Sequence, residues 1–263
     1  MFKAFKSEWI KVRRRAMLIG GFSMSIFSGL FVPLGIIRAT SGHFGGLPVI
    51  FLSTDKGLTT VMSRGVTLTA VIALIIVASA TAAEYSHGTL RNLLVRQPHR
   101  LKLLIGKFAG LLSYVLIAAT IAFAVGIIAG LIIAPGHGVD TKAWTSAGGL
   151  SNLMALYGEL LFAALGYSLL GFFSAVLFQS AAAAVAVPLA YIIIVENLIG
   201  AVWTDAPQWL FGQLVSSVIN HESLLRADTG TATFNRGLTL GVGYMIAFAI
   251  ATGALFRFRD VTA

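Results

Sequence analysis

Two acidic residues, Glu159 and Glu196, lie inside long apolar runs of the sequence. A carboxylate in hydrocarbon costs about 2.5 to 3.5 kcal/mol on insertion scales, so each side chain must find a partner or take up a proton. Both lie toward the outer ends of their runs, where they could face one another or a water-filled cavity. With Tyr191 they are candidates for a substrate path or gate. The structural alternative is that Tyr191, Tyr167 or Asn197 satisfies the carboxylates by hydrogen bonding.

Three short patterns resemble catalytic motifs, and each lacks an essential residue. Residues 221–222 (HE) begin a zinc-protease motif, but no second His follows at the required spacing. Residues 166–170 (GYSLL) miss the closing Gly of a nucleophile elbow by one place. Residues 101–108 (LKLLIGKF) have Leu where the first Gly of a phosphate-binding loop belongs. We therefore expect no catalytic residue, no cofactor and no metal site in this chain.

The densest mixture of charge, Gly and Pro, EYSHGTLRNLLVRQPHRLKLLIGKF, occupies residues 84–108 between two apolar runs. Gly88 permits a sharp change of direction, Thr89 can cap a short helix, and Pro98 ends that helix. Residues 84–107 are therefore predicted to form a rigid elbow across the membrane face, whose second half continues into the next apolar run. The elbow could dock a cytoplasmic partner, or it could simply face solvent and phospholipid.

The elements that must position these residues follow from composition. The 263-residue chain is 57% apolar and 11% charged, and its mean hydropathy is +0.87. These values exceed what a soluble domain can bury, so we expect an all-α integral membrane protein with one transmembrane domain, residues 1–263. The absence of Cys excludes disulfides and thiol catalysis. The net charge of +9 is explained by loop charges that set topology rather than by nucleic-acid binding.

Six apolar runs are long enough to cross a bilayer, since a span needs about 20 residues. Small residues at Gly126 and Gly130, and at Gly237 and Gly241, allow helices to pack closely within the chain or in a dimer. Pro188 should kink the fifth run, because it lacks a backbone donor. The predicted spans are residues 16–37, 66–83, 108–134, 152–178, 181–201 and 236–257.

The distribution of basic residues orients these spans. Thirteen of the nineteen Lys and Arg residues lie in the amino-terminal segment, between spans two and three, and at the carboxyl end. Basic residues accumulate on the cytoplasmic side of membrane proteins. Both termini and the elbow are therefore predicted to be cytoplasmic, in a multi-pass membrane protein.

Two segments outside the spans are expected to be structured. Residues 1–15 place aromatic and apolar side chains at helical spacing beside Lys and Arg, which predicts an amphipathic helix in the membrane interface. This helix could bind a partner or only anchor the first span. The outer segment, residues 202–235, carries two Trp and is interrupted by Pro207. It should form one or two short helices at the outer surface or dipping into it, where a gate or substrate vestibule could lie.

The elbow also resembles the signature of ABC-2 type permeases, the membrane subunits of ATP-binding cassette exporters. The matching residues are Glu84, Gly88, Thr89, Leu90, Arg91, Leu94, Pro98, Arg100 and Lys107. A second stretch, SEWIKVRRRAML at residues 7–18, is similar to the amino-terminal region of the same family. The resemblance covers nearly the whole chain. It implies a type V exporter-like fold in which two permeases, identical or related, pair with two cytoplasmic ATPase subunits.

The resemblance also implies roles for particular residues. The elbow would be the coupling helix that sits in a groove of the ATPase, and the amino-terminal helix would be the interface helix beside it. ATP and Mg²⁺ would be bound by the partner subunit, so this chain would not itself be an enzyme. The implied docking residues are Glu84, His87, Gly88, Thr89, Arg91, Asn92 and Arg96, and those of the interface helix are Phe5, Glu8, Trp9 and Lys11.

The function that this implies is export of a hydrophobic or amphipathic compound, such as a drug, a peptide antibiotic or a lipid-like molecule. The alternative is a non-transporting sensor or scaffold subunit that uses the same elbow to hold a cytoplasmic partner. An ion channel is disfavoured because the spans carry few polar residues and no filter-like loop.

Overall fold

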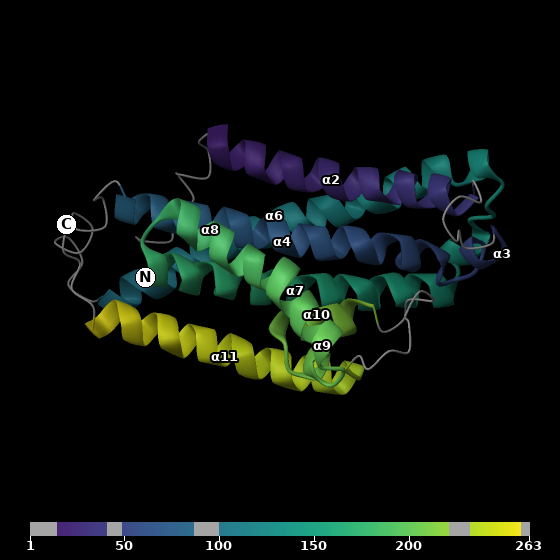
Figure 1. Cartoon of the computed structure of the whole chain (residues 1–263). Helices are drawn as coiled ribbons and strands as arrows, with labels where there is room; N and C mark the ends of the chain where they lie inside the picture. The colour runs from purple at the N-terminus through teal and green to yellow at the C-terminus, as the bar shows by residue number, and fades with distance from the viewer. Residues whose placement is uncertain (1–14, 41–48, 87–99, 221–231, 259–263) are drawn as a thin grey trace.

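The computed structural model describes residues 15–40, 49–86, 100–220 and 232–258, and within these ranges the regular secondary structure is all helical (Figure 1). The chain folds as a bundle of long helices with a few short helical segments at its connections. In chain order the elements are α2 (Arg15–Thr40), α3 (Val49–Leu52), α4 (Gly57–Ser86), α6 (Arg100–Ile133), the 3-10 helices η1 (Pro135–His137) and η2 (Lys142–Thr145), α7 (Ala147–Phe178), α8 (Ala181–Ala190), the π-helix η3 (Tyr191–Val195), α9 (Glu196–Val202), the 3-10 helix η4 (Ala206–Gln208), α10 (Phe211–Ile219) and α11 (Phe234–Phe258).

Five helical segments in the described ranges are long and apolar enough to cross a membrane. They are α4, the Leu101–Ile133 part of α6, α7, the continuous rod Ala181–Val202 made by α8, η3 and α9, and α11. They cover five of the six predicted spans. The chain is therefore an all-helical, multi-pass integral membrane protein, as its composition predicts.

The first predicted span, residues 16–37, falls within α2. This helix is 26 residues long and continues to Thr40. It packs along α4 and α6 (Figure 1). The approach is close because glycines face the neighbouring helices: a Cβ at Gly21 would lie 2.5 Å from the Tyr114 hydroxyl, and one at Gly35 would clash with Val61.

Two helices extend well beyond the spans predicted from hydropathy. α4 begins nine residues before the predicted start at 66, and α6 begins at Arg100 rather than at 108. At a rise of about 1.5 Å per residue the two helices are about 45 and 51 Å long, which exceeds the roughly 30 Å hydrocarbon core. The first turn of α4 is buried by protein instead of lipid: Leu58 is 1% exposed. Near it, the Trp144 indole donates a hydrogen bond of 2.7 Å to the Leu52 carbonyl.

The centre of the bundle is the contact between α4 and α7. In the apolar stretch of α7, 67% of the residues are buried within the chain, whereas in that of the Ala181–Val202 rod only 11% are. Gly171 of α7 lies against the backbone of α4, where an added Cβ would come within 2.6 Å of the Leu74 carbonyl oxygen. This spacing lets the two helices gain dispersion contacts along their length.

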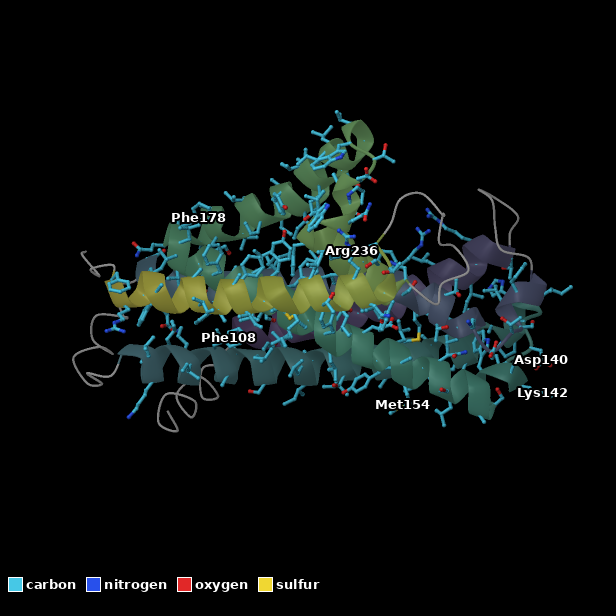
Figure 2. The ribbon with its side chains drawn as sticks, turned by 90° about the horizontal axis from the view of Figure 1, so that it is seen from below. Phe108, Asp140, Lys142, Met154, Phe178 and Arg236 are labelled. Atoms are coloured by element: carbon cyan, nitrogen blue, oxygen red, sulfur yellow. The ribbon has the colours of Figure 1, made fainter. Side chains whose placement is uncertain are left out.

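The rod from Ala181 to Val202 leaves the bundle at an angle (Figure 2). It starts close to Phe178, and its far end stands away from α11. Pro188 lies inside α8, and three residues later the helix becomes the π-helical segment η3. The helix is therefore irregular just after Pro188, and the kink predicted there stays a prediction.

After this rod the chain turns back into the bundle. η4 makes the turn, and the nine-residue α10 then packs against α7 and α11. Seven residues of α10 are buried, including Phe211 and Leu214. The predicted short helix of the outer segment thus exists, and it lies within the protein core rather than on its surface.

Candidate functional site

Glu196 lies at the point where the rod meets the returning helix α10. Its Oε1 accepts a hydrogen bond of 2.9 Å from the Gly212 backbone N–H, and its Oε2 accepts one of 3.1 Å from the Gln213 N–H. These two donors belong to the first turn of α10, whose N-cap residue, Leu210, has no side chain able to accept them. The carboxylate therefore caps α10 from a distant part of the chain, where the helix dipole also favours negative charge.

This cap is built against a glycine. A Cβ added at Gly212 would lie 2.5 Å from Glu196 Oε2, so a larger residue there would displace the carboxylate. With glycine the carboxylate can reach both N–H groups at once. Glu196 is fully buried, so two charge-assisted hydrogen bonds compensate for its loss of solvation.

Tyrosines complete the surroundings of Glu196. The side chain of Tyr191 lies against the carboxylate, and Tyr167 of α7 is close enough to interact with it electrostatically. Tyr167 also packs on Phe211, the first residue of α10, with ring centroids 5.7 Å apart. Of the three partners that the sequence suggested, two therefore lie at Glu196. The third, Asn197, instead donates to the Ile193 carbonyl.

Glu159 does not belong to this cluster. It is buried in α7, eight residues before Tyr167, which corresponds to about 12 Å along the helix axis. In the described part of the chain, the groups around the Glu196 carboxylate are Gly212, Gln213 and the two tyrosines rather than Glu159. Glu159 and Glu196, which the sequence placed toward the outer ends of their spans, therefore lie in different places in the structure.

Two further contacts hold the turn before α10, and the sequence did not single them out. The Tyr244 hydroxyl of α11 donates a hydrogen bond of 2.8 Å to the Trp209 carbonyl. The Arg236 guanidinium, in the first turn of α11, lies over the Trp209 ring, 4.5 Å from its centroid. We call residues 209–213 the α10 turn. The sequence offers two weak signals for these contacts. Arg236 is a basic residue at the start of a predicted span, and the N-cap position of α10 holds Leu210, which cannot cap the helix itself.

Aromatic packing joins the α10 turn to the bundle. The Phe211 ring contacts those of Tyr244 and Phe248, with centroids 5.9 and 5.4 Å apart, and Phe248 stacks on Phe173 of α7 at 5.6 Å. α10 is therefore packed between α7 and α11. Any movement of α10 relative to α7 must break these contacts.

A second charged site lies at the other end of the bundle, where α4 ends and α6 begins. Glu84 of α4 and Lys107 of α6 form an ion pair, and their side chains are only 12% and 4% exposed. Lys107 is turned inward, toward α4. A buried carboxylate needs a countercharge, and Lys107 supplies it across the helix pair. The pair joins the two helices that flank the elbow.

The other residues predicted to bind the ATPase lie outside the described residues. They are His87, Gly88, Thr89, Arg91, Asn92 and Arg96 of the elbow, and Phe5, Glu8, Trp9 and Lys11 of the interface helix. Within the ranges that the structure describes, no three His, Asp or Glu side chains are grouped so that they could hold a metal ion. The arrangement at Glu196 fixes a helix and offers no nucleophile with an activating base.

The long apolar helices and the buried charged residues at their junctions define a polytopic membrane protein. The chain matches the family model described as ABC-2 family transporter protein over residues 4–196. It therefore belongs to the ABC-2 family of transporters and is a membrane permease. No curated protein matches the chain. The family match ends at Glu196, so α10 and α11, which complete the site around it, lie beyond the matched range.

Proposed function

We propose that this chain forms the translocation path of an ABC-2 transporter for a hydrophobic or amphipathic substrate, and that a separate ATPase subunit drives it. The observation that carries this proposal is the family match over residues 4–196. Membership of this family implies an ATP-binding cassette partner. The candidate substrates are those expected from the sequence: a drug, a peptide antibiotic or a lipid-like molecule.

In the proposed topology α2 is a sixth span and both termini are cytoplasmic, in the bacterial plasma membrane. The length of α2, 26 residues, and its packing along α4 and α6 support this assignment. The excess of Lys and Arg at the termini and in the elbow supports the orientation. η2 then lies on the outer face, and the Glu84–Lys107 pair lies near the cytoplasmic face.

The proposed coupling route runs from the elbow into α4 and α6. These helices end and begin at Ser86 and Arg100, on either side of the elbow, and the Glu84–Lys107 ion pair ties them together. An ATPase that pushed on the elbow would therefore move the two helices as a unit. Since α4 packs along α7, this movement would reach the centre of the bundle and shift it between inward-open and outward-open arrangements.

On the outer side we assign α10 the role of a gate. It returns into the core after the rod, and it is held by Glu196 from the rod and by Tyr244 from α11. Breaking these contacts would free α10 to change position. In this proposal Glu196 and Tyr191 hold the gate closed, and they do not carry protons.

The assembly would contain two permeases and two ATPase subunits. In the apolar stretch of the Ala181–Val202 rod, only 11% of the residues are buried within the chain. In the apolar stretch of α11 the share is 17%. These faces are available to membrane lipid and to a second permease, identical or related.

The test is affinity purification of the tagged chain from its host membranes, followed by mass spectrometry. An ABC ATPase subunit should co-purify with the wild type, and Arg91→Ala in the elbow should abolish its recovery. Lys142→Ala is the matched control, because it also removes one basic residue but lies in η2, at the other end of the bundle. Glu84→Ala is less informative, since it also breaks the ion pair with Lys107.

Absence of an ATPase from wild-type preparations made under mild extraction would contradict the proposal. Recovery of a kinase in its place would favour the sensor or scaffold function.

A further inference from the structure

Arg236 is a charged residue that the proposed transport mechanism leaves unexplained. Its Nε atom is buried and has no hydrogen-bond partner among the described residues. No carboxylate in the described ranges forms an ion pair with it. Its observed contact is the Trp209 ring, 4.5 Å from the guanidinium carbon. This contact covers one face of the planar group, and no described residue accepts a hydrogen bond from its in-plane donors.

The position of Arg236 is unusual for an arginine that is only a surface charge. Figure 2 shows it set back along the bundle from Asp140 and Lys142, which lie at the η2 end. α11 has 25 residues, whereas α6 and α7 have 34 and 32, so α11 is about 14 Å shorter than α6 and about 10 Å shorter than α7. In the proposed topology Arg236 therefore lies below the outer rim, at the depth of the outer leaflet. An arginine at this depth is costly unless an anion accompanies it.

The first turn of α11 adds to the positive character of this place. Arg236 is the third residue of α11, and no acidic residue occurs in that turn. The amino-terminal end of a helix carries a partial positive charge, which favours anions. Trp209 is 52% exposed, so its ring offers apolar surface directly beside the charge.

We propose that Arg236 and Trp209 bind an amphiphile with an anionic headgroup, a phosphate or a carboxylate. The guanidinium donates to the headgroup oxygens in its own plane, and the exposed Trp209 ring packs on the adjoining alkyl chain. An amphiphile with a cationic or uncharged headgroup lacks the acceptor that this site requires. This proposal rests on the proposed function, because it specifies the headgroup charge of the exported amphiphile. Binding to Arg236 and Trp209 can nevertheless be measured without an ATPase and without transport.

The experiment is isothermal titration calorimetry of the purified full-length chain in dodecyl maltoside. The probes are hexyl phosphate and hexanoate, with hexyltrimethylammonium as the cationic counterpart of the same chain length. Arg236→Gln should weaken binding of hexyl phosphate about tenfold, because it removes a hydrogen bond to a charged group. Arg257→Gln is the matched control: Arg257 lies on the same helix and over an aromatic ring, Phe258, but at the opposite end.

A second variant separates loss of the charge from loss of the fold. Trp209→Leu keeps Arg236 and removes the aromatic platform, so it should weaken hexyl phosphate and hexanoate together. Size-exclusion profiles show whether each variant remains folded. Equal affinity of the wild type and a folded Arg236→Gln variant for hexyl phosphate would overturn the proposal. Equal or tighter binding of hexyltrimethylammonium to the wild type would overturn it as well.

The anionic headgroup could come from a membrane phospholipid or from a free amphiphile. The same titration in nanodiscs distinguishes these sources, with one set made of phosphatidylcholine and the other containing phosphatidylglycerol. If phosphatidylglycerol suppresses binding of hexyl phosphate, the site takes a phospholipid headgroup. If binding is the same in both, the site takes the free amphiphile. Either outcome retains an anion site at Arg236, whereas absence of binding in both membranes and in detergent removes it.

Discussion

At the residue scale, the feature that best defines this site is one carboxylate that bonds to two backbone N–H groups. Glu196 reaches Gly212 and Gln213 across a gap of sixteen and seventeen residues in the chain. An acidic residue inside a predicted span indicates function, and the sequence indicated this much. It could not reveal the partners, because backbone N–H groups are present at every non-proline residue and only the fold decides which of them are unpaired.

We expect Glu196→Gln to destabilise the protein by about 1 to 3 kcal/mol. The amide keeps one acceptor oxygen, but its NH₂ group would face a backbone N–H that then lacks an acceptor. Thermal unfolding in detergent, followed by fluorescence-detected size exclusion, measures the change. Asn197→Ala is the control, since Asn197 bonds only within its own helix. An unchanged unfolding temperature for Glu196→Gln would contradict the assigned cap.

Gly212→Ala should destabilise the protein by displacing the same carboxylate, because its Cβ would come within 2.5 Å of Glu196 Oε2. A loss of about 1 to 3 kcal/mol is expected, as for overpacking in a well-packed core. Gly243→Ala serves as the comparison, because nothing lies within 4 Å of the added Cβ there. The same unfolding assay should separate the two variants, and equal behaviour would show that the α10 turn adjusts freely.

At the scale of elements, the ion pair between Glu84 and Lys107 determines how the two helices flanking the elbow are held. The sequence singled out Glu84 as a docking residue, a role that remains a prediction. The structure shows that its carboxylate bonds inward to Lys107, a residue 23 positions later. The sequence could not distinguish these orientations, because a lysine at the end of a span is compatible with both.

Breaking this pair should be more costly than removing a surface charge. Lys107→Met is expected to destabilise the protein by about 3 to 5 kcal/mol, because it leaves a carboxylate in a buried place without this countercharge. The reversed pair, Glu84→Lys with Lys107→Glu, should recover a large part of the loss. Thermal unfolding of Glu84→Lys, of Lys107→Glu and of the double variant forms the cycle. Additive losses in the double variant would show that the two residues do not stabilise each other.

At the scale of the whole molecule, the arrangement of helices decides which parts of the chain face protein and which face lipid. Hydropathy placed five of the six runs on helices that are long and apolar enough to span. It started two of them too late, because the first turns of α4 and α6 contain polar residues. Those turns are nevertheless helical. In α4 the first turn is buried, with Gly57 against the Leu52 backbone of α3 and Leu58 against Gly130 of α6, and hydropathy does not report such contacts.

The proposed topology requires an even number of spans, which can be tested directly. Reporter fusions at the carboxyl terminus and within residues 138–141 should report opposite sides of the membrane, with the carboxyl terminus cytoplasmic. A fusion at the amino terminus should report the same side as the carboxyl terminus, because α2 would then cross the bilayer. Termini on opposite sides would remove α2 from the set of spans.

The sequence by itself determined that this chain is helical and embedded in a membrane, and its elbow motif indicated the family to which it belongs. Both conclusions depend on local properties: the length and hydropathy of each run, and the order of residues in one short segment. Only the tertiary structure decided that Glu196 caps α10, that Glu84 pairs with Lys107, and that Arg236 lies on Trp209. These pairings join residues distant in the chain, and hydropathy depends on neighbouring residues alone, so it carries no information about them.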